Sequence, residues 1–177
     1  MTEDQFLDAL GQREGLTYSE PPKNDQPTGP YGITLGTLKA ETSGLASLDA
    51  LRRLSVSDAR TLAQRKLRRD TVAFGLDKIT DEHLRYQLLD FAYNSGPQRA
   101  IRWLQRTLGF RRELITGVLD DRTLRLITAT ASPIVNNALV AARLRMLDDA
   151  VDSGTVNAKF EEGLESRALS FGVFDTR

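Results

Sequence analysis

The sequence predicts a mostly α-helical protein with an ordered loop or small hairpin near its N-terminus. Apolar residues recur at helical spacing along most of the chain, and helix-capping residues stand before these segments. Alternation with a period of two never extends beyond a few residues, which argues against a sheet. The 177 residues are 40% hydrophobic and 27% charged, a composition typical of globular proteins.

The first predicted helix follows Thr2, which forms a capping box with Gln5, and it ends near Gly15. Residues 16–33 hold four prolines and two tyrosines, and we expect them to form the ordered loop or hairpin. Thr34 is placed to cap a short helix that runs through Ala40.

Further helices are predicted by capping residues and by prolines at first helical positions. Their expected ranges are about 48–54, 58–70, 82–96, 97–108, 121–130, 132–153 and 157–170. No repeat or low-complexity linker is visible, so we expect one domain, residues 1–177. Its two lobes would be residues 1–80 and 81–177, with residues 71–80 as the best candidate for a hinge.

Composition excludes several kinds of site. The 24 basic and 24 acidic residues cancel, so any attraction to a polyanion must be local. The absence of cysteine excludes disulfides and Cys-ligated zinc, and the single His83 excludes a His-rich metal site. We expect no metal or organic cofactor.

The start of the chain, Met1–Phe6, is acidic and lacks the pattern of a secretory signal peptide. No apolar run approaches the ~20 residues that cross a bilayer, so membrane insertion is not expected. We expect synthesis in the cytoplasm, with any external substrate reached through a separate export or release route.

Glu14-Gly15 at the end of the first predicted helix is the leading candidate for chemistry. Cleaving a glycosidic bond requires a carboxylic acid that stays protonated near neutral pH. The partial negative charge at a helix C-terminus disfavours ionisation of a carboxyl group there, and partial burial adds to this effect. Glu14 therefore has the position expected of a general acid, although a surface glutamate at a helix end is the simpler interpretation.

The loop after Glu14 offers candidate partners. Asp25 is placed to hold or deprotonate a water, and the Thr34 hydroxyl to position that water or simply to cap its helix. Tyr18 and Tyr31 are expected either to stack on sugar faces or to form the private core of the loop.

A second patch runs from Asp90 to Pro97 and ends one helix and starts the next. Tyr93 and Asn94 are candidate substrate contacts, because amides and phenols bind N-acetyl and hydroxyl groups. Trp103 is better explained as core than as a sugar platform.

Arg99, Arg102 and Arg106 form a basic stripe at helical spacing. A solvated helix face is the favoured interpretation, and contact with an anionic cell-wall polymer is the functional one. The short helix from residue 57 is weak evidence for DNA binding, so no nucleic-acid partner is expected.

At these residues the chain resembles the glycoside hydrolase family 108 N-acetylmuramidases, a lysozyme-like group that includes secretion-associated muramidases and phage endolysins. The family motif Glu-Gly-Gly-Tyr matches Glu14 to Tyr18 with one residue inserted, and Tyr-Gly-Ile-Thr matches Tyr31 to Thr34. The family stretch Asp-Phe-Ala-x-Asn-Ser-Gly-Pro matches Asp90 to Pro97. The aspartate of the family loop Asp-Pro-Gly-Gly falls on Asn24, next to Asp25.

The resemblance implies a lysozyme-like helical fold and cleavage of the β-1,4 bond between N-acetylmuramic acid and N-acetylglucosamine, with Glu14 as the catalytic acid. It also implies that the lobe 81–177 resembles the predicted peptidoglycan-binding region of the family. The expected partner is bacterial peptidoglycan, met in the periplasm or cell wall after specialised export or phage-mediated release. The alternative is a weak or inactive module that binds glycan strands in an envelope-spanning machine or phage particle.

Overall fold

The structure is a computed structural model that describes residues 1–20, 26–154 and 161–173. All regular structure in these ranges is helical, apart from two isolated antiparallel bridges, Ser19–Thr28 and Thr28–Thr34. The predicted mostly α fold with a small N-terminal hairpin is confirmed, and it is consistent with a lysozyme-like helical domain. The chain divides into two compact units, Met1–Asp70 and Thr71–Arg177.

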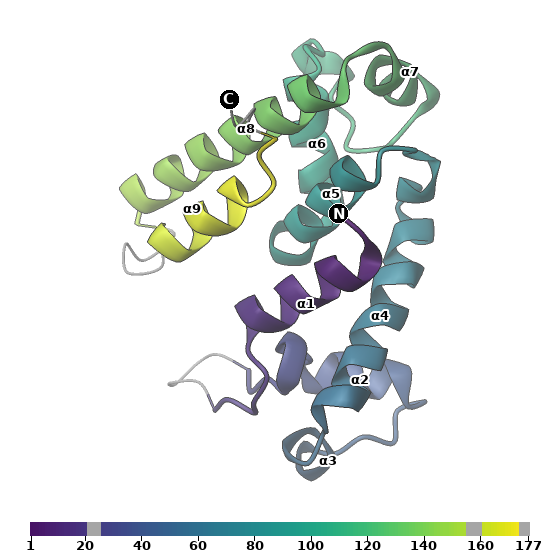
Figure 1. Cartoon of the computed structure of the whole chain (residues 1–177), viewed down its shortest axis with the longest axis vertical. Coiled ribbons are helices and arrows are strands. Elements are labelled where there is room, and N and C mark those ends of the chain that lie inside the picture. Colours follow the sequence, from purple (N-terminus) through teal and green to yellow (C-terminus); the bar gives the residue numbers. More distant parts are fainter. Residues whose placement is uncertain (21–25, 155–160, 174–177) are drawn as a thin grey trace. The chain divides into compact units, whose positions relative to one another are not determined.

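The first unit holds the helices up to α4, whose last residues lie beyond Asp70 (Figure 1). In chain order these are α1 (Glu3–Glu14), the short 3-10 helix η1 (Pro30–Gly32), α2 (Leu35–Glu41), α3 (Leu48–Arg52) and α4 (Val56–Ala73). Their starts follow local capping. The Thr2 and Gln5 side chains form the predicted capping box, and the Thr34 and Ser47 hydroxyls accept hydrogen bonds from Thr37 N and Ala50 N.

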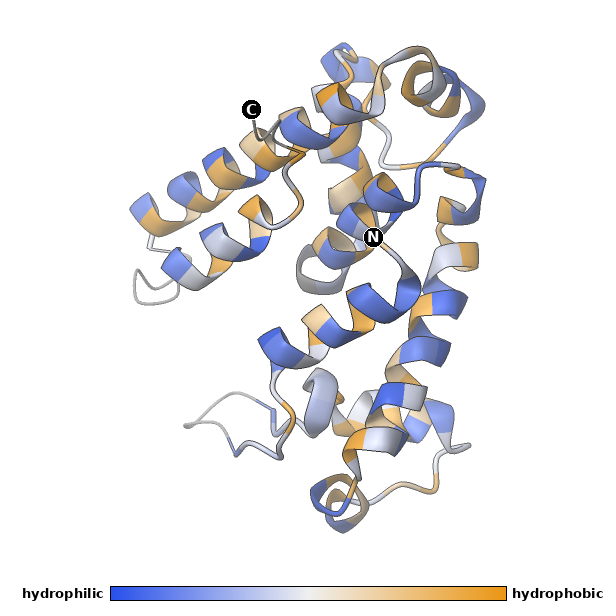
Figure 2. Ribbon diagram, in the orientation of Figure 1, coloured by the Kyte–Doolittle hydropathy of each residue, from blue (hydrophilic) through white to orange (hydrophobic). Residues whose placement is uncertain are grey.

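The core of the first unit draws on α1 and α4, and also on buried residues of η1, α2 and α3. Phe6, Leu7 and Leu10 are almost fully buried on α1, as their spacing predicts. The apolar face of α4 contributes Ala59, Leu62, Ala63 and Leu67. Each helix carries hydrophilic residues elsewhere on its length, which Figure 2 shows as alternating blue and orange segments.

The second unit contains the remaining helices and two 3-10 turns. These are η2 (Leu76–Lys78), α5 (Glu82–Ser95), α6 (Pro97–Thr107), η3 (Arg112–Leu114), α7 (Asp121–Ala129), α8 (Ser132–Asp152) and α9 (Glu161–Leu169). Asp81 and Asp120 cap α5 and α7 by accepting from Leu84 N and Thr123 N. Pro97 and Pro133 occupy first-turn positions, where a missing N–H does not matter.

Helix α5 packs against both α6 and α8, and α8 also packs against α6, α7 and α9. Helix α5 is buried over most of its length, including Leu84, Leu88 and Phe91. Helix α8 is the longest in the described ranges, and α9 packs along it. No helix in those ranges has both the length and the apolar character needed to cross a membrane.

Candidate functional site

Glu14 is the last residue of α1, and its side chain is half-buried. The helix ends there because Gly15 takes φ 90° and ψ 154°, a conformation that residues with a Cβ rarely adopt. The Gly15 amide still donates to Gly11 O at 3.0 Å, so the last turn is closed. The backbone that carries Glu14 is therefore fixed up to the residue that follows it.

Tyr31, in the loop after α1, contacts this helix end through both its backbone and its ring. Its amide donates to Gly15 O at 2.8 Å, which joins η1 to the residue after Glu14. Its ring lies against Gly11, where an added Cβ would come within 2.8 Å of ring carbon Cε1. Gly11 is therefore a packing requirement, because only a residue without a side chain leaves room for the ring.

Tyr31 itself is held in an unfavourable backbone conformation. Its φ of 60° and ψ of 22° lie in the left-handed region, which costs on the order of 1–3 kcal/mol for a residue other than glycine. Only 4% of the residue is exposed. Of the two roles considered for this tyrosine, burial favours the private core of the loop, and the ring offers no open face for stacking on a sugar.

Tyr18 lies on the hairpin and remains half-buried. The hairpin is joined by two bonds between Ser19 and Thr28, at 2.8 and 3.1 Å. The Tyr18 hydroxyl donates to Glu20 Oε1 at 3.2 Å, and the guanidinium of Arg52 lies 5.7 Å from its ring centroid. Tyr18 is thus part of a polar surface cluster with Glu20 and Arg52.

The carboxylate of Glu20 in this cluster is held ionised. Arg52 Nη2 donates to Glu20 Oε1 at 2.7 Å. This bond, with the Tyr18 hydroxyl, lowers the pKa of Glu20 below its ordinary value. Glu20 is therefore a poor proton donor at neutral pH.

Thr34 begins α2 and is half-buried. Its hydroxyl oxygen accepts from Thr37 N at 3.1 Å and lies 3.1 Å from the Thr37 hydroxyl. The capping role is therefore observed. A catalytic role for the same hydroxyl stays a prediction, since a hydroxyl that accepts one bond can still donate or accept another.

For three other predicted site residues, the described structure does not test a place beside Glu14. Asp25 lies in residues 21–25, outside the described ranges, as does the side chain of Asn94. Tyr93 is half-buried near the end of α5, in the second unit. A cleft formed by Glu14 together with Tyr93 and Asn94 therefore stays a prediction.

The first residue of the second motif, Asp90, has a structural role that the sequence did not reveal. It is fully buried and paired with Arg143 Nη2 at 2.7 Å and Arg167 Nε at 2.9 Å. These arginines belong to α8 and α9, so one carboxylate joins three helices. Arg143 also lies over the rings of Phe91 and Phe171, at 5.0 and 5.7 Å from their centroids.

Neither the packing role of Gly11 nor this pairing was predicted from the sequence. A glycine inside a helix costs about 1 kcal/mol relative to alanine, which was a signal that its position has a packing reason. No comparable signal pointed to Arg143 and Arg167, because they lie 53 and 77 residues from Asp90 in the chain.

One group of carboxylates in the described ranges is close enough together to hold a metal ion. Asp148, Glu161 and Glu165 each offer an oxygen within 4.8 Å of the others. They lie on α8 and α9, at exposed or half-buried positions. Acidic groups gathered on a surface are common without an ion, so this cluster does not indicate a metal centre.

Comparison with known proteins shows that the chain is similar to solved structures, among them one that it matches along nearly its whole length. The structure of Brucella abortus SagA is 28% identical in sequence, with a TM-score of 0.64, and the match covers 99% of this chain and 100% of that one. No protein-family model matches the chain. No curated protein matches it.

Proposed function

We propose that this protein is a peptidoglycan hydrolase, an N-acetylmuramidase with Glu14 as its general acid. The observation that carries the proposal is the helix end at Glu14. A half-buried carboxyl side chain stands on a backbone that Gly15 and Tyr31 hold in one conformation. A general acid has to be positioned in this way, because proton transfer requires hydrogen-bond reach to the leaving oxygen. The likeness to SagA along the entire chain supports a lysozyme-like, peptidoglycan-related protein.

In the proposed reaction, Glu14 donates its proton to the glycosidic oxygen between N-acetylmuramic acid and N-acetylglucosamine. A water activated by Asp25 or positioned by Thr34 completes hydrolysis. Tyr18, Tyr93 and Asn94 are the proposed substrate contacts. We further propose that the enzyme meets peptidoglycan in the periplasm or cell wall, after specialised export or phage-mediated release.

Replacing Glu14 by Gln tests the proposal because it keeps the shape of the side chain and removes the proton. We expect wild-type protein to release new reducing ends and muropeptides from purified peptidoglycan, measured by reducing-sugar assay and mass spectrometry. We expect Glu14→Gln to lose at least ~100-fold in rate, the lower range for a general acid. Glu113→Gln, at an exposed position in η3, is the matched control and should retain full activity. Full activity in Glu14→Gln would assign the acid to another residue.

A module that binds glycan strands without cutting them is the second candidate. It is favoured by the sequence of the loop after Glu14, where Asn24 stands in place of the aspartate of the family loop Asp-Pro-Gly-Gly. Sedimentation of wild-type protein with peptidoglycan, without any new reducing ends, would select this function over the hydrolase.

A further inference from the structure

An arginine-rich surface covers the part of the second unit that contains α6, η3 and α7. Residues 97–131 contain seven arginines, no lysine and only three acidic residues, in a chain whose net charge is zero. All seven are exposed: Arg99, Arg102, Arg106, Arg111, Arg112, Arg122 and Arg125. We call these seven residues the arginine surface.

The arginine surface differs from the other charged regions in how its cations are used. In the first unit, Arg52, Arg60 and Arg69 each form an ion pair with a carboxylate. Among the described residues, no carboxylate lies within ion-pairing distance of any arginine of the arginine surface. Their charges are not neutralised by the protein, so they create a local positive potential on a neutral molecule.

Helix α6 supplies the most regular part of this surface. Arg99, Arg102 and Arg106 follow one another at i, i+3 and i+7, so they lie on one face and span about 10 Å of helix axis. The side chain of Arg102 packs closely against Gly117. A Cβ added at Gly117 would lie 3.0 Å from Arg102 Nε. The arrangement is a row of charges rather than a convergent pocket, which suits a polymer better than a small anion.

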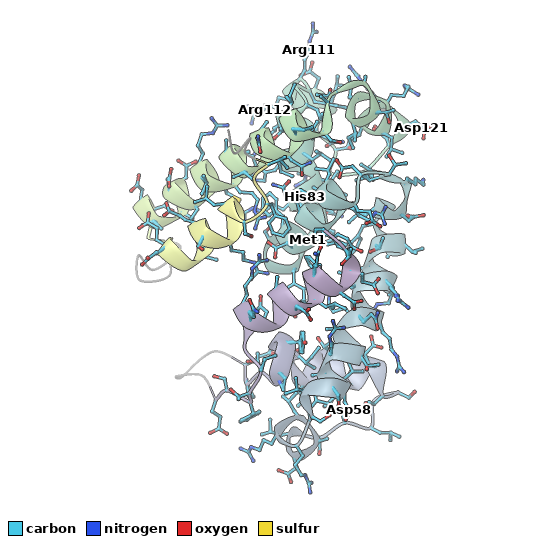
Figure 3. The ribbon with its side chains drawn as sticks, in the orientation of Figure 1. Met1, Asp58, His83, Arg111, Arg112 and Asp121 are labelled. Carbon is cyan, nitrogen blue, oxygen red and sulfur yellow. The ribbon has the colours of Figure 1, made fainter. Side chains whose placement is uncertain are left out.

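The loop between α6 and α7 is fixed by one buried side chain. Gln105 donates to Val118 O at 2.9 Å and accepts from Gly117 N at 3.0 Å. It also contacts the hydroxyl of Thr123, in the first turn of α7. The arginines of α6 and α7 are therefore held on a common support. Arg111 lies between these helices in sequence, and its side chain projects away from the ribbon (Figure 3).

The aromatic rings of this surface are already covered by arginines. The Arg106 guanidinium lies 4.7 Å from the centroid of Trp103, and that of Arg122 lies 5.1 Å from the centroid of Phe110. Proteins that bind single-stranded nucleic acid combine basic residues with open aromatic faces for the bases. Phe110 is also buried, and one face of Trp103 is occupied by Arg106, so contacts of the exposed arginines to a charged backbone are favoured over contacts to bases.

We propose that the arginine surface binds a linear phosphodiester polymer without bases, of the polyol-phosphate kind, through its backbone phosphates. Arginine presents a planar fork of donors that matches phosphate oxygens and stays charged at every physiological pH. A diester backbone repeats one negative charge per unit, which a row of exposed arginines contacts at several points. This binding is independent of Glu14, so Glu14→Gln should bind as tightly as wild type.

Trp103 provides a fluorescence signal for binding, because it is the single tryptophan of the chain and Arg106 lies over its ring. We would titrate full-length protein with poly(glycerol phosphate) and follow tryptophan fluorescence, with gel-shift or sedimentation as a second readout. We expect a saturable change, and an affinity that falls linearly on a log–log plot against salt concentration.

The triple variant Arg99→Gln, Arg102→Gln, Arg106→Gln should weaken binding at least ~10-fold and reduce the salt slope by about 2 to 3. The pair Arg111→Gln, Arg112→Gln changes the exposed N-cap and the exposed first residue of η3, and gives a second variant with little risk to folding. The control variant Lys39→Gln, Lys78→Gln, Arg145→Gln removes three exposed cations elsewhere and should bind like wild type.

Several outcomes would overturn the proposal. Binding of a single-stranded oligodeoxynucleotide without binding of poly(glycerol phosphate) would assign the surface to nucleic acid. Equal affinity for poly(glutamate) of the same charge would show that phosphate is not recognised. A control variant that loses as much affinity as the α6 variant would show that net charge alone drives the binding.

Discussion

Charged side chains in the first unit pair on its surface, whereas in the second unit one carboxylate is buried between two arginines. Arg60 contacts Asp4 and Asp8, whose side chains are 80% and 64% exposed. Asp90 is 0% exposed, and its partners Arg143 and Arg167 are 8% and 9% exposed. The two arrangements have the same chemistry, but water surrounds one and is excluded from the other.

The difference determines what each arrangement contributes. Exposed ion pairs contribute about 0.2–1 kcal/mol each and are screened by salt. A buried pair adds little net stability relative to well-packed apolar residues, yet removing one partner leaves an uncompensated charge in the interior. We infer that the first unit tolerates loss of its charged residues one at a time, while α5, α8 and α9 depend on a single carboxylate.

The largest effect is expected from Asp90→Asn. The substitution keeps the size of the side chain and leaves two buried arginines without their counter-charge, which should destabilise the protein by about 3–5 kcal/mol. Urea unfolding would measure this loss, with Asp8→Asn as the surface control at less than about 1 kcal/mol. In 1 M salt the Asp8→Asn effect should vanish and the Asp90→Asn effect should persist. Equal losses in the two variants would show that burial does not distinguish the two units.

Gly11→Ala should have the next largest effect, in the first unit. A Cβ at residue 11 would meet ring carbons of Tyr31 at 2.8 and 2.9 Å, and this overpacking should cost about 1–3 kcal/mol. Gly163→Ala is the matched control, because α9 leaves open space there and alanine favours a helix by up to about 1 kcal/mol.

The displaced Tyr31 ring should also disturb Glu14, so the rate of peptidoglycan cleavage should fall in Gly11→Ala beyond what stability explains. Activity measured well below the unfolding temperature separates the two effects. A Gly11→Ala protein as stable and active as wild type would show that the contact with Tyr31 does not position the helix end.

Removal of a helix cap should lower the free energy of unfolding by a similar, smaller amount in either unit. Thr34→Ala and Asp81→Ala each remove an accepted backbone hydrogen bond, which typically costs about 1 kcal/mol. Hydrogen bonds from Ser132 and from the amides of Leu84 and His83 outweigh burial and lower the pKa of Asp81. Its capping contribution should therefore weaken in acid, whereas the Thr34 contribution should not change between pH 7 and pH 3. Unfolding midpoints at several pH values would test this contrast.

Glu3→Gln should have the smallest effect, below about 1 kcal/mol. Arg68 Nη2 donates to Glu3 Oε1 at 2.7 Å, and Gln64 donates to the same oxygen at 2.5 Å. The hydrogen bond from Arg68 is the main reason that the pKa of Glu3 lies below its ordinary 4.5. A carboxyl group whose pKa is lowered by folding stabilises the folded state at pH values above its pKa in the unfolded chain. This stabilisation is lost as the pH falls through its pKa in the folded protein. The difference between wild type and Glu3→Gln should therefore be constant near pH 7 and shrink as the pH falls through the lowered pKa of Glu3.

Most helix starts could be read from the sequence because capping is local. Thr2, Thr34, Ser47, Asp81 and Asp120 each bind an amide three residues further along, so a short window contains all the interacting groups. Gly15 could be read as a helix end for the same reason, and with it the position of Glu14 on the last turn.

The tertiary structure alone decided what surrounds those elements. The ring of Tyr31 packs on Gly11, 20 residues earlier in the chain, and Asp90 pairs with arginines on two later helices. Such contacts depend on how helices pack, and their energies come from burial that no local pattern encodes. The sequence by itself thus determined most of the helix starts and which carboxyl group stands at the first helix end, whereas predicted bounds such as 58–70 differ by a few residues from the observed Val56–Ala73. Packing decided which aromatic and charged side chains are buried, because exclusion of water is a property of the assembled core.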